Sequence, residues 1–141
     1  MSLIWGILII VLVSIAWFGQ IVSAISPKLA AKLGVCESES DVDKTFFIDQ
    51  RAEAIWDSFT SWILLAAGIL LIIDHQLWPY FGLIGGGIFL NFSGRGIITR
   101  IAFQSKGIVV GKKSNLVTAY TFLSIWLLIS IVTIIWAVSV I

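Results

Sequence analysis

Charged residues are scarce in this chain. Lys, Arg, Asp and Glu together make up 12% of its 141 residues, against roughly 25% in an average soluble domain. Hydrophobic residues make up 59%, more than a soluble fold of this size could cover while keeping a wettable surface. Lipid removes that constraint, because its tails are themselves apolar. The composition predicts a membrane protein, and the length predicts a single domain over residues 1–141.

Cysteine and histidine are equally sparse, and each shortage excludes a class of chemistry. The single cysteine, Cys36, cannot form an internal disulfide or a Cys-x-x-Cys redox pair. No catalytic or metal-binding set can be assembled around the single histidine, His75. No basic stretch interleaves with aromatic residues, as it would in a nucleic-acid-binding protein. We therefore expect no catalytic residue, no metal, no cofactor and no nucleic-acid partner.

Four apolar segments are present, and each can form a transmembrane helix. A span needs about 20 residues, since each residue advances a helix by about 1.5 Å and the hydrocarbon core is about 30 Å thick. The third segment is rich in glycine, which in a membrane lets helices approach closely: Gly82, Gly85, Gly86, Gly87 and Gly94. The sequence predicts an all-α bundle of four transmembrane helices, over about residues 3–25, 45–74, 78–103 and 115–140.

The first loop, about residues 26–55, contains signals for one more short helix. Ser26 is a typical cap, Pro27 suits the first helical position, and Gly34 is a typical stop. Lys28 and Lys32 lie four residues apart on this segment. We expect it to lie in the membrane interface with its lysines reaching toward water.

The basic residues predict the orientation of the bundle. All nine fall in the first and third loops or their flanks: Lys28, Lys32, Lys44, Arg51, Arg95, Arg100, Lys106, Lys112 and Lys113. Loops rich in Lys and Arg remain in the cytoplasm. The sequence therefore predicts a multi-pass protein of the cell (inner) membrane, with loops one and three cytoplasmic and both termini extracytoplasmic.

A stripe of carboxylates on the second helix is the first candidate site. Asp49, Glu53 and Asp57 are spaced four residues apart, so they share one helix face. On the third helix, Asn91 and Arg95 share a face at a similar depth. We expect a cluster of Glu53, Asp57, Asn91 and Arg95, which either locks the helices together at the water interface or binds a ligand or ion.

The basic third loop is the second candidate site. It carries five cations and no acid between Arg95 and Lys113. Such a loop binds anionic lipid head groups or an acidic partner, or it is only the ordinary topology signal. The residues that we expect to bind head groups are Arg100, Lys106, Lys112 and Lys113.

Part of the chain resembles the membrane-associated eicosanoid and glutathione enzymes, which also have four helices and carry Arg, Asn and Glu on the second. Here Lys32-Leu33-Gly34-Val35 is followed by Gln50-Arg51-Ala52-Glu53. Arg51 is similar to the family's arginine, but Ile55 stands at the Asn position and Asp57 only approximates the acid. The resemblance implies a glutathione-dependent transferase that holds an anionic cofactor with Arg51, Arg95 and Arg100. Small multidrug transporters share only the size of this chain.

Three functional hypotheses follow. The first is a non-enzymatic bundle that binds partner subunits or anionic lipid at its cytoplasmic face. The second is a small transporter or channel, working as a homo-oligomer, whose path is lined by Asp57 and Arg95. The third is the transferase that the resemblance implies.

Overall fold

The computed structural model describes residues 1–141 and is all-helical. Four helices are long and apolar enough to cross a membrane, so the predicted all-α class and its four long apolar helices are confirmed. They are α1 (Ser2–Ile25), the nearly continuous pair α3 (Lys44–Thr60) and α4 (Trp62–Ile72), α5 (Trp78–Ser105) and α6 (Lys113–Ser139). Two short elements lie between α1 and α3, namely α2 (Pro27–Lys32) and the 3-10 turn η1 (Glu39–Asp41).

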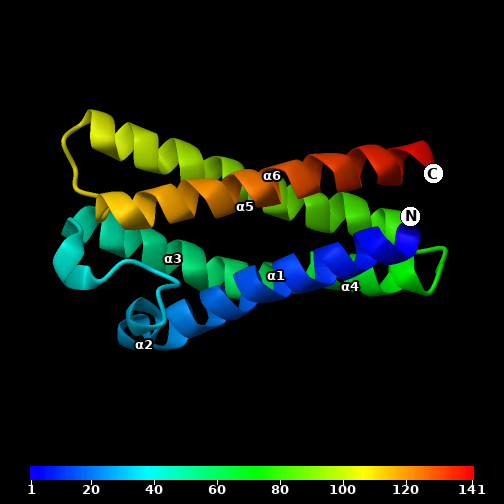
Figure 1. Cartoon of the computed structure of the whole chain (residues 1–141), viewed down its shortest axis with the longest axis horizontal. Coiled ribbons are helices and arrows are strands. Elements are labelled where there is room, and N and C mark those ends of the chain that lie inside the picture. The colour runs from blue at the N-terminus through cyan, green and yellow to red at the C-terminus, as the bar shows by residue number, and fades with distance from the viewer.

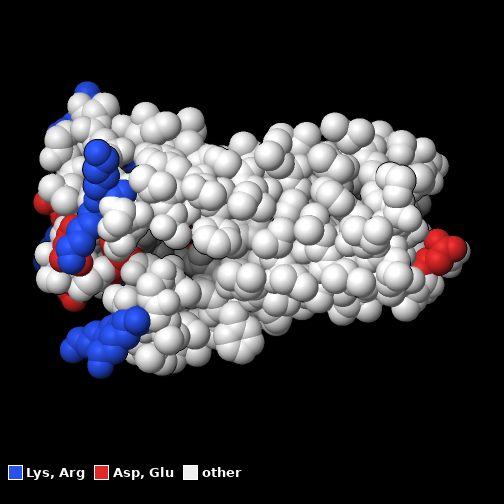
Figure 2. All heavy atoms as spheres, viewed as in Figure 1, with Lys and Arg blue, Asp and Glu red and all other residues white.

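The long helices run side by side along the longest axis of the molecule (Figure 1). One end carries both chain termini and the α4–α5 turn, and we call it the terminal end. The other end carries α2, η1 and the α5–α6 loop. Figure 2 shows the Lys and Arg side chains gathered there, so we call it the charged end. Helix α1 packs on α3 and α4, and α5 packs on α4 and α6, whereas α1 and α6 contact each other only weakly.

Glycines let α5 approach its neighbours closely. A Cβ added at Gly85 would lie 2.6 Å from the backbone nitrogen and the Cα of Leu64 on α4. A Cβ at Gly86 would lie 2.7 Å from the Ile134 side chain on α6. Small residues at such contacts are what membrane helices need in order to pack. Two other glycines of α5, Gly87 and Gly94, face open space, because an added Cβ there would meet no atom within 4 Å. The prediction of close helix packing is wrong for these two residues.

The predicted helix over residues 45–74 is divided at Ser61. This residue is buried, keeps helical dihedral angles (φ −68°, ψ −21°), and donates its backbone N–H to the carbonyl of Asp57 at 2.9 Å. The interruption is therefore local, and α3 and α4 continue in nearly one line (Figure 1).

The short helix expected in the first loop is present as α2. The Ser26 hydroxyl accepts from the backbone N–H of Leu29 at 3.4 Å, and Pro27 occupies the first helical position. Gly34 has a φ of +72°, which a glycine adopts without the steric cost of a side chain. The cap at Ser26, the proline at Pro27 and the stop at Gly34 thus predicted the position of this helix along the chain correctly.

Candidate functional site

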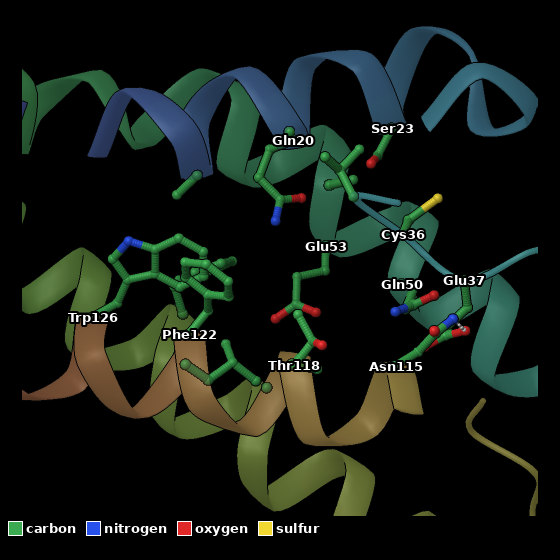
Figure 3. A pocket seen from close by; sticks show the side chains of 18 of the residues that line it. Gln20, Ser23, Cys36, Glu37, Gln50, Glu53, Asn115, Thr118, Phe122 and Trp126 are labelled. Atoms are coloured by element: carbon green, nitrogen blue, oxygen red, sulfur yellow. Dashed lines mark hydrogen bonds between the residues drawn. The ribbon is translucent and has the colours of Figure 1, made fainter. Parts of the chain in front are cut away.

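A cavity of about 280 Å³ lies among the helices at the charged end. Four helices and the first loop contribute its polar lining (Figure 3): Gln20 and Ser23 from α1, Cys36 and Glu37 from the loop, Gln50 and Glu53 from α3, Arg100 from α5, Asn115 and Thr118 from α6. Residues far apart in the sequence therefore meet around one space, which is the usual setting of a ligand site.

The deep end of the cavity is aromatic. Trp126 and Phe122 lie opposite Glu37 and Asn115 in Figure 3. Phe92 on α5 completes this end, and its ring centroid is 5.6 Å from that of Trp126. The cavity thus changes from charged to apolar along the bundle axis.

Two indole hydrogen bonds join α1 to α6 beyond the cavity. Trp126 Nε1 donates to the carbonyl of Leu12 at 3.0 Å, and Trp5 Nε1 donates to Thr133 Oγ1 at 3.1 Å. Toward the charged end the two helices diverge (Figure 1), and the surface is hollowed between them (Figure 2). The cavity therefore opens sideways between α1 and α6.

Arg95 forms two ion pairs with α3. Its Nη2 lies 2.6 Å from Asp49 Oδ1 and its Nη1 lies 2.8 Å from Glu53 Oε1. Asp57, one turn further, is 3% exposed, forms no ion pair, and its Oδ2 has no hydrogen-bond partner. Asn91 is exposed and forms no side-chain hydrogen bond. Of the four residues expected in a cluster, the structure brings Glu53 and Arg95 together and adds Asp49 in place of Asp57.

Arg100 is the cation that faces the cavity. Its Nη1 donates to the carbonyl of Gly96, one turn earlier on α5, at 2.9 Å. Its guanidinium lies 5.3 Å from the centroid of the Phe46 ring, a cation–π distance. Its Nε is buried without a hydrogen-bond partner. The sequence suggested Arg100 as a head-group ligand beside the loop lysines, or as a cofactor ligand under the transferase hypothesis, and no sequence pattern indicated that its side chain turns inward.

The other cations expected to bind head groups stay outside the cavity. Lys112 pairs with Asp41 at 2.9 Å, and this contact raises the pKa of Lys112. Lys106 and Lys113 are exposed and form no ion pair. The structure thus separates Arg100 from the three lysines with which it was expected to act.

Glu37 closes the charged end of the cavity. It is 5% exposed, and its Oε2 accepts from Asn115 Nδ2 at 2.9 Å. Gly111 leaves the room for this carboxylate, since any Cβ there would collide with it. Asp43 joins the same two loops, because its N–H donates to the Val109 carbonyl at 2.8 Å and its carboxylate accepts from the Val109 N–H. The sequence offered no signal for these contacts between loops.

Cys36 lies beside this mouth as a free thiol. Its Sγ donates to the carbonyl of Pro27 at 3.7 Å. Burial raises the pKa of the Cys36 thiol, the Ser23 hydroxyl partly opposes this, and the neighbouring Glu37 carboxylate raises it further. The thiol is therefore protonated and weakly nucleophilic at neutral pH.

Comparison with protein-family models, curated proteins and solved structures finds no match for this chain. The arginine that suggested the eicosanoid and glutathione enzymes, Arg51, is exposed and does not line the cavity.

Proposed function

We propose that this chain is a multi-pass protein of the cell (inner) membrane that binds a membrane lipid. The lipid head group occupies the polar end of the cavity, and its chains leave between α1 and α6. The observation that carries this proposal is the direction of the cavity. Its lining changes from charged to aromatic along the axis that a lipid follows in a bilayer.

Depth along the helices supports the proposal. A transmembrane span takes about 20 residues. If the spans begin at the terminal ends of α6 and α4, at Ser139 and Ile72, they reach the opposite membrane boundary at Tyr120 and Glu53. Trp126 and Phe122 then lie at hydrocarbon depth, and Asn115 lies at the level of the head groups. The cavity crosses the boundary between these two regions, as an amphiphile does.

The lateral opening also favours a lipid over a soluble ligand. A lipid in the surrounding leaflet reaches the cavity by moving within the membrane plane, without being extracted into water. Asn115, Thr118 and Phe122 line the cavity and are still exposed on the surface. A bound lipid would cover these side chains.

The charge distribution supports an orientation with the charged end in the cytoplasm. All Lys and Arg residues lie at that end, as the rule for cytoplasmic loops expects. Both termini are then extracytoplasmic, and α2 lies in the cytoplasmic interface with Lys28 and Lys32 exposed.

A binding role is favoured over the two other hypotheses. A channel needs a continuous path, but beyond the cavity the bundle is filled by side chains with at most 1% exposure: Ile9, Val13, Leu64 and Phe89. The transferase needs Arg51 at the site, and that residue is exposed outside it. Partner subunits and a homo-oligomer stay predictions.

Filling the cavity tests the proposal. Ala119 lines the cavity from α6, whereas Ser124 is an exposed residue of the same helix outside the cavity. We expect Ala119→Trp to abolish the lipid that co-purifies in mild detergent and is detected by native mass spectrometry. Ser124→Trp, the matched control, should retain that lipid. Equal lipid occupancy in both variants would reject the cavity as the binding site.

A further inference from the structure

The charged groups in and beside the cavity do not balance. Two carboxylates, those of Glu37 and Glu53, line the cavity against one guanidinium, that of Arg100. Arg95 is already engaged by Asp49 and Glu53 at 2.6 and 2.8 Å. A carboxylate held away from water is costly unless a cation or hydrogen-bond donors meet it. The occupant of the cavity is therefore expected to supply a positive group.

The same cavity also offers unused donors. Arg100 Nη1 donates one hydrogen bond to the carbonyl of Gly96 on the same helix, and the buried Nε of Arg100 has no partner. A guanidinium matches the oxygen atoms of a phosphate or carboxylate, to which it can donate two bonds at once. The occupant is therefore also expected to supply an oxyanion.

We infer that the lipid head group is zwitterionic, with a phosphate on Arg100 and a primary ammonium between Glu37 and Glu53. This inference rests on the proposed function and names its ligand class. Figure 3 shows the Glu53 carboxylate pointing into the middle of the cavity, with Glu37 at its polar end. A purely anionic head group would meet these two carboxylates without offering them a cation.

A primary ammonium fits this lining better than a quaternary one. An ammonium donates several hydrogen bonds, and the lining is rich in acceptors. Besides the two carboxylates, these include the side-chain oxygens of Gln20, Gln50 and Thr118. A trimethylated amine carries the charge but donates no hydrogen bond. The lining therefore selects a phosphoethanolamine head group over phosphocholine and phosphoglycerol.

Binding of head-group analogues to the purified full chain in detergent tests the inference. The probes are lipids with identical short acyl chains and a phosphoethanolamine, phosphocholine or phosphoglycerol head group, together with water-soluble phosphoethanolamine. We expect the phosphoethanolamine lipid to bind about tenfold more tightly than the other two lipids, as charge-assisted hydrogen bonds to one carboxylate allow. The soluble head group should bind far more weakly, because it lacks the chains that contact Phe122 and Trp126.

Two variants assign the head group's charges. Glu37→Gln keeps the size of the side chain and should remove the preference for phosphoethanolamine over phosphocholine. Arg100→Gln should weaken the binding of all three lipids by about tenfold, because a charge-assisted contact to the phosphate is lost. Lys106→Gln, at an exposed position of the same end, is the control and should bind like the unmodified chain. If Arg100→Gln does not fold, Glu37→Gln still decides the ammonium site.

The outcomes separate the inference from the function on which it rests. Equal or tighter binding of the phosphoglycerol lipid to the unmodified chain would overturn the zwitterionic assignment and leave lipid binding intact. Equally tight binding of soluble phosphoethanolamine would support the head-group chemistry and overturn the membrane lipid as its source. Binding of none of the probes would overturn both.

Discussion

The contact between α4 and α5 at Gly85 gives a quantitative test of the packing. An added Cβ would lie 2.6 Å from the backbone nitrogen and Cα of Leu64, whereas carbon atoms in contact normally sit about 3.5–4.0 Å apart. The backbone of α4 cannot rotate away as a side chain can, so Gly85→Ala must separate the two helices. Overpacking of this kind costs about 1–3 kcal/mol.

Gly87→Ala is the matched control, since it changes the same helix at a position where the new Cβ meets no atom within 4 Å. Both substitutions gain similar helix propensity, about 1 kcal/mol, so the difference between the variants isolates the clash. The free energy of unfolding in mixed micelles, followed by circular dichroism, should be lower for G85A than for G87A by about 1–3 kcal/mol. Equal stability of the two variants would refute the close approach of α4 and α5.

Three further predictions concern the site and its supports. Trp126→Phe removes the indole bond to α1 and should lower the free energy of unfolding by about 1 kcal/mol; an unchanged value would exclude that bond. Arg95→Gln should lower the free energy of unfolding by about 1 kcal/mol, since the ion pairs of Arg95 are partly exposed. Lys113→Gln, the control, should leave the free energy of unfolding unchanged. Maleimide labelling of Cys36 should be slow at neutral pH and keep accelerating above the ordinary thiol pKa, because burial raises the pKa of Cys36; rapid labelling at pH 7 would contradict this.

The four long apolar helices were predictable because their signal is local. Hydrocarbon demands long apolar runs, and each of the four helices satisfies that demand within its own sequence. The short helix α2 was predictable for a similar reason, since Ser26, Pro27 and Gly34 act on their immediate neighbours. The gathering of basic residues at one end required only counting Lys and Arg between spans.

The partner of Arg95 was not predictable, because three carboxylates on α3 share one face. Asp49, Glu53 and Asp57 are equivalent in the sequence pattern, and the choice among them depends on how far α5 is shifted along α3. The observed shift pairs Arg95 with Asp49 and Glu53 and leaves Asp57 buried one turn away. Helical periodicity defines a face and does not define that axial offset.

The cavity was not predictable either, because its decisive residues are brought together by tertiary contacts. Glu37 lies in a loop and is held by Asn115, 78 residues further along the chain. Arg100 belongs to a run of cations, and only the packing of α5 turns it inward. Which glycines are packed also depends on the direction each faces, so Gly85 and Gly87 differ although both belong to one Gly-Gly-Gly run.

Photo-crosslinking in a membrane tests lipid occupancy of the cavity most directly. The probe is a phosphoethanolamine lipid that carries a diazirine at the top of one acyl chain, and the adducts are mapped by mass spectrometry. We expect the adducts to concentrate on the deep wall of the cavity, at Phe122, Trp126 and Phe92. Adducts spread equally over outward-facing residues at the same depth, such as Ile98 on α5, would contradict a lipid bound within the bundle.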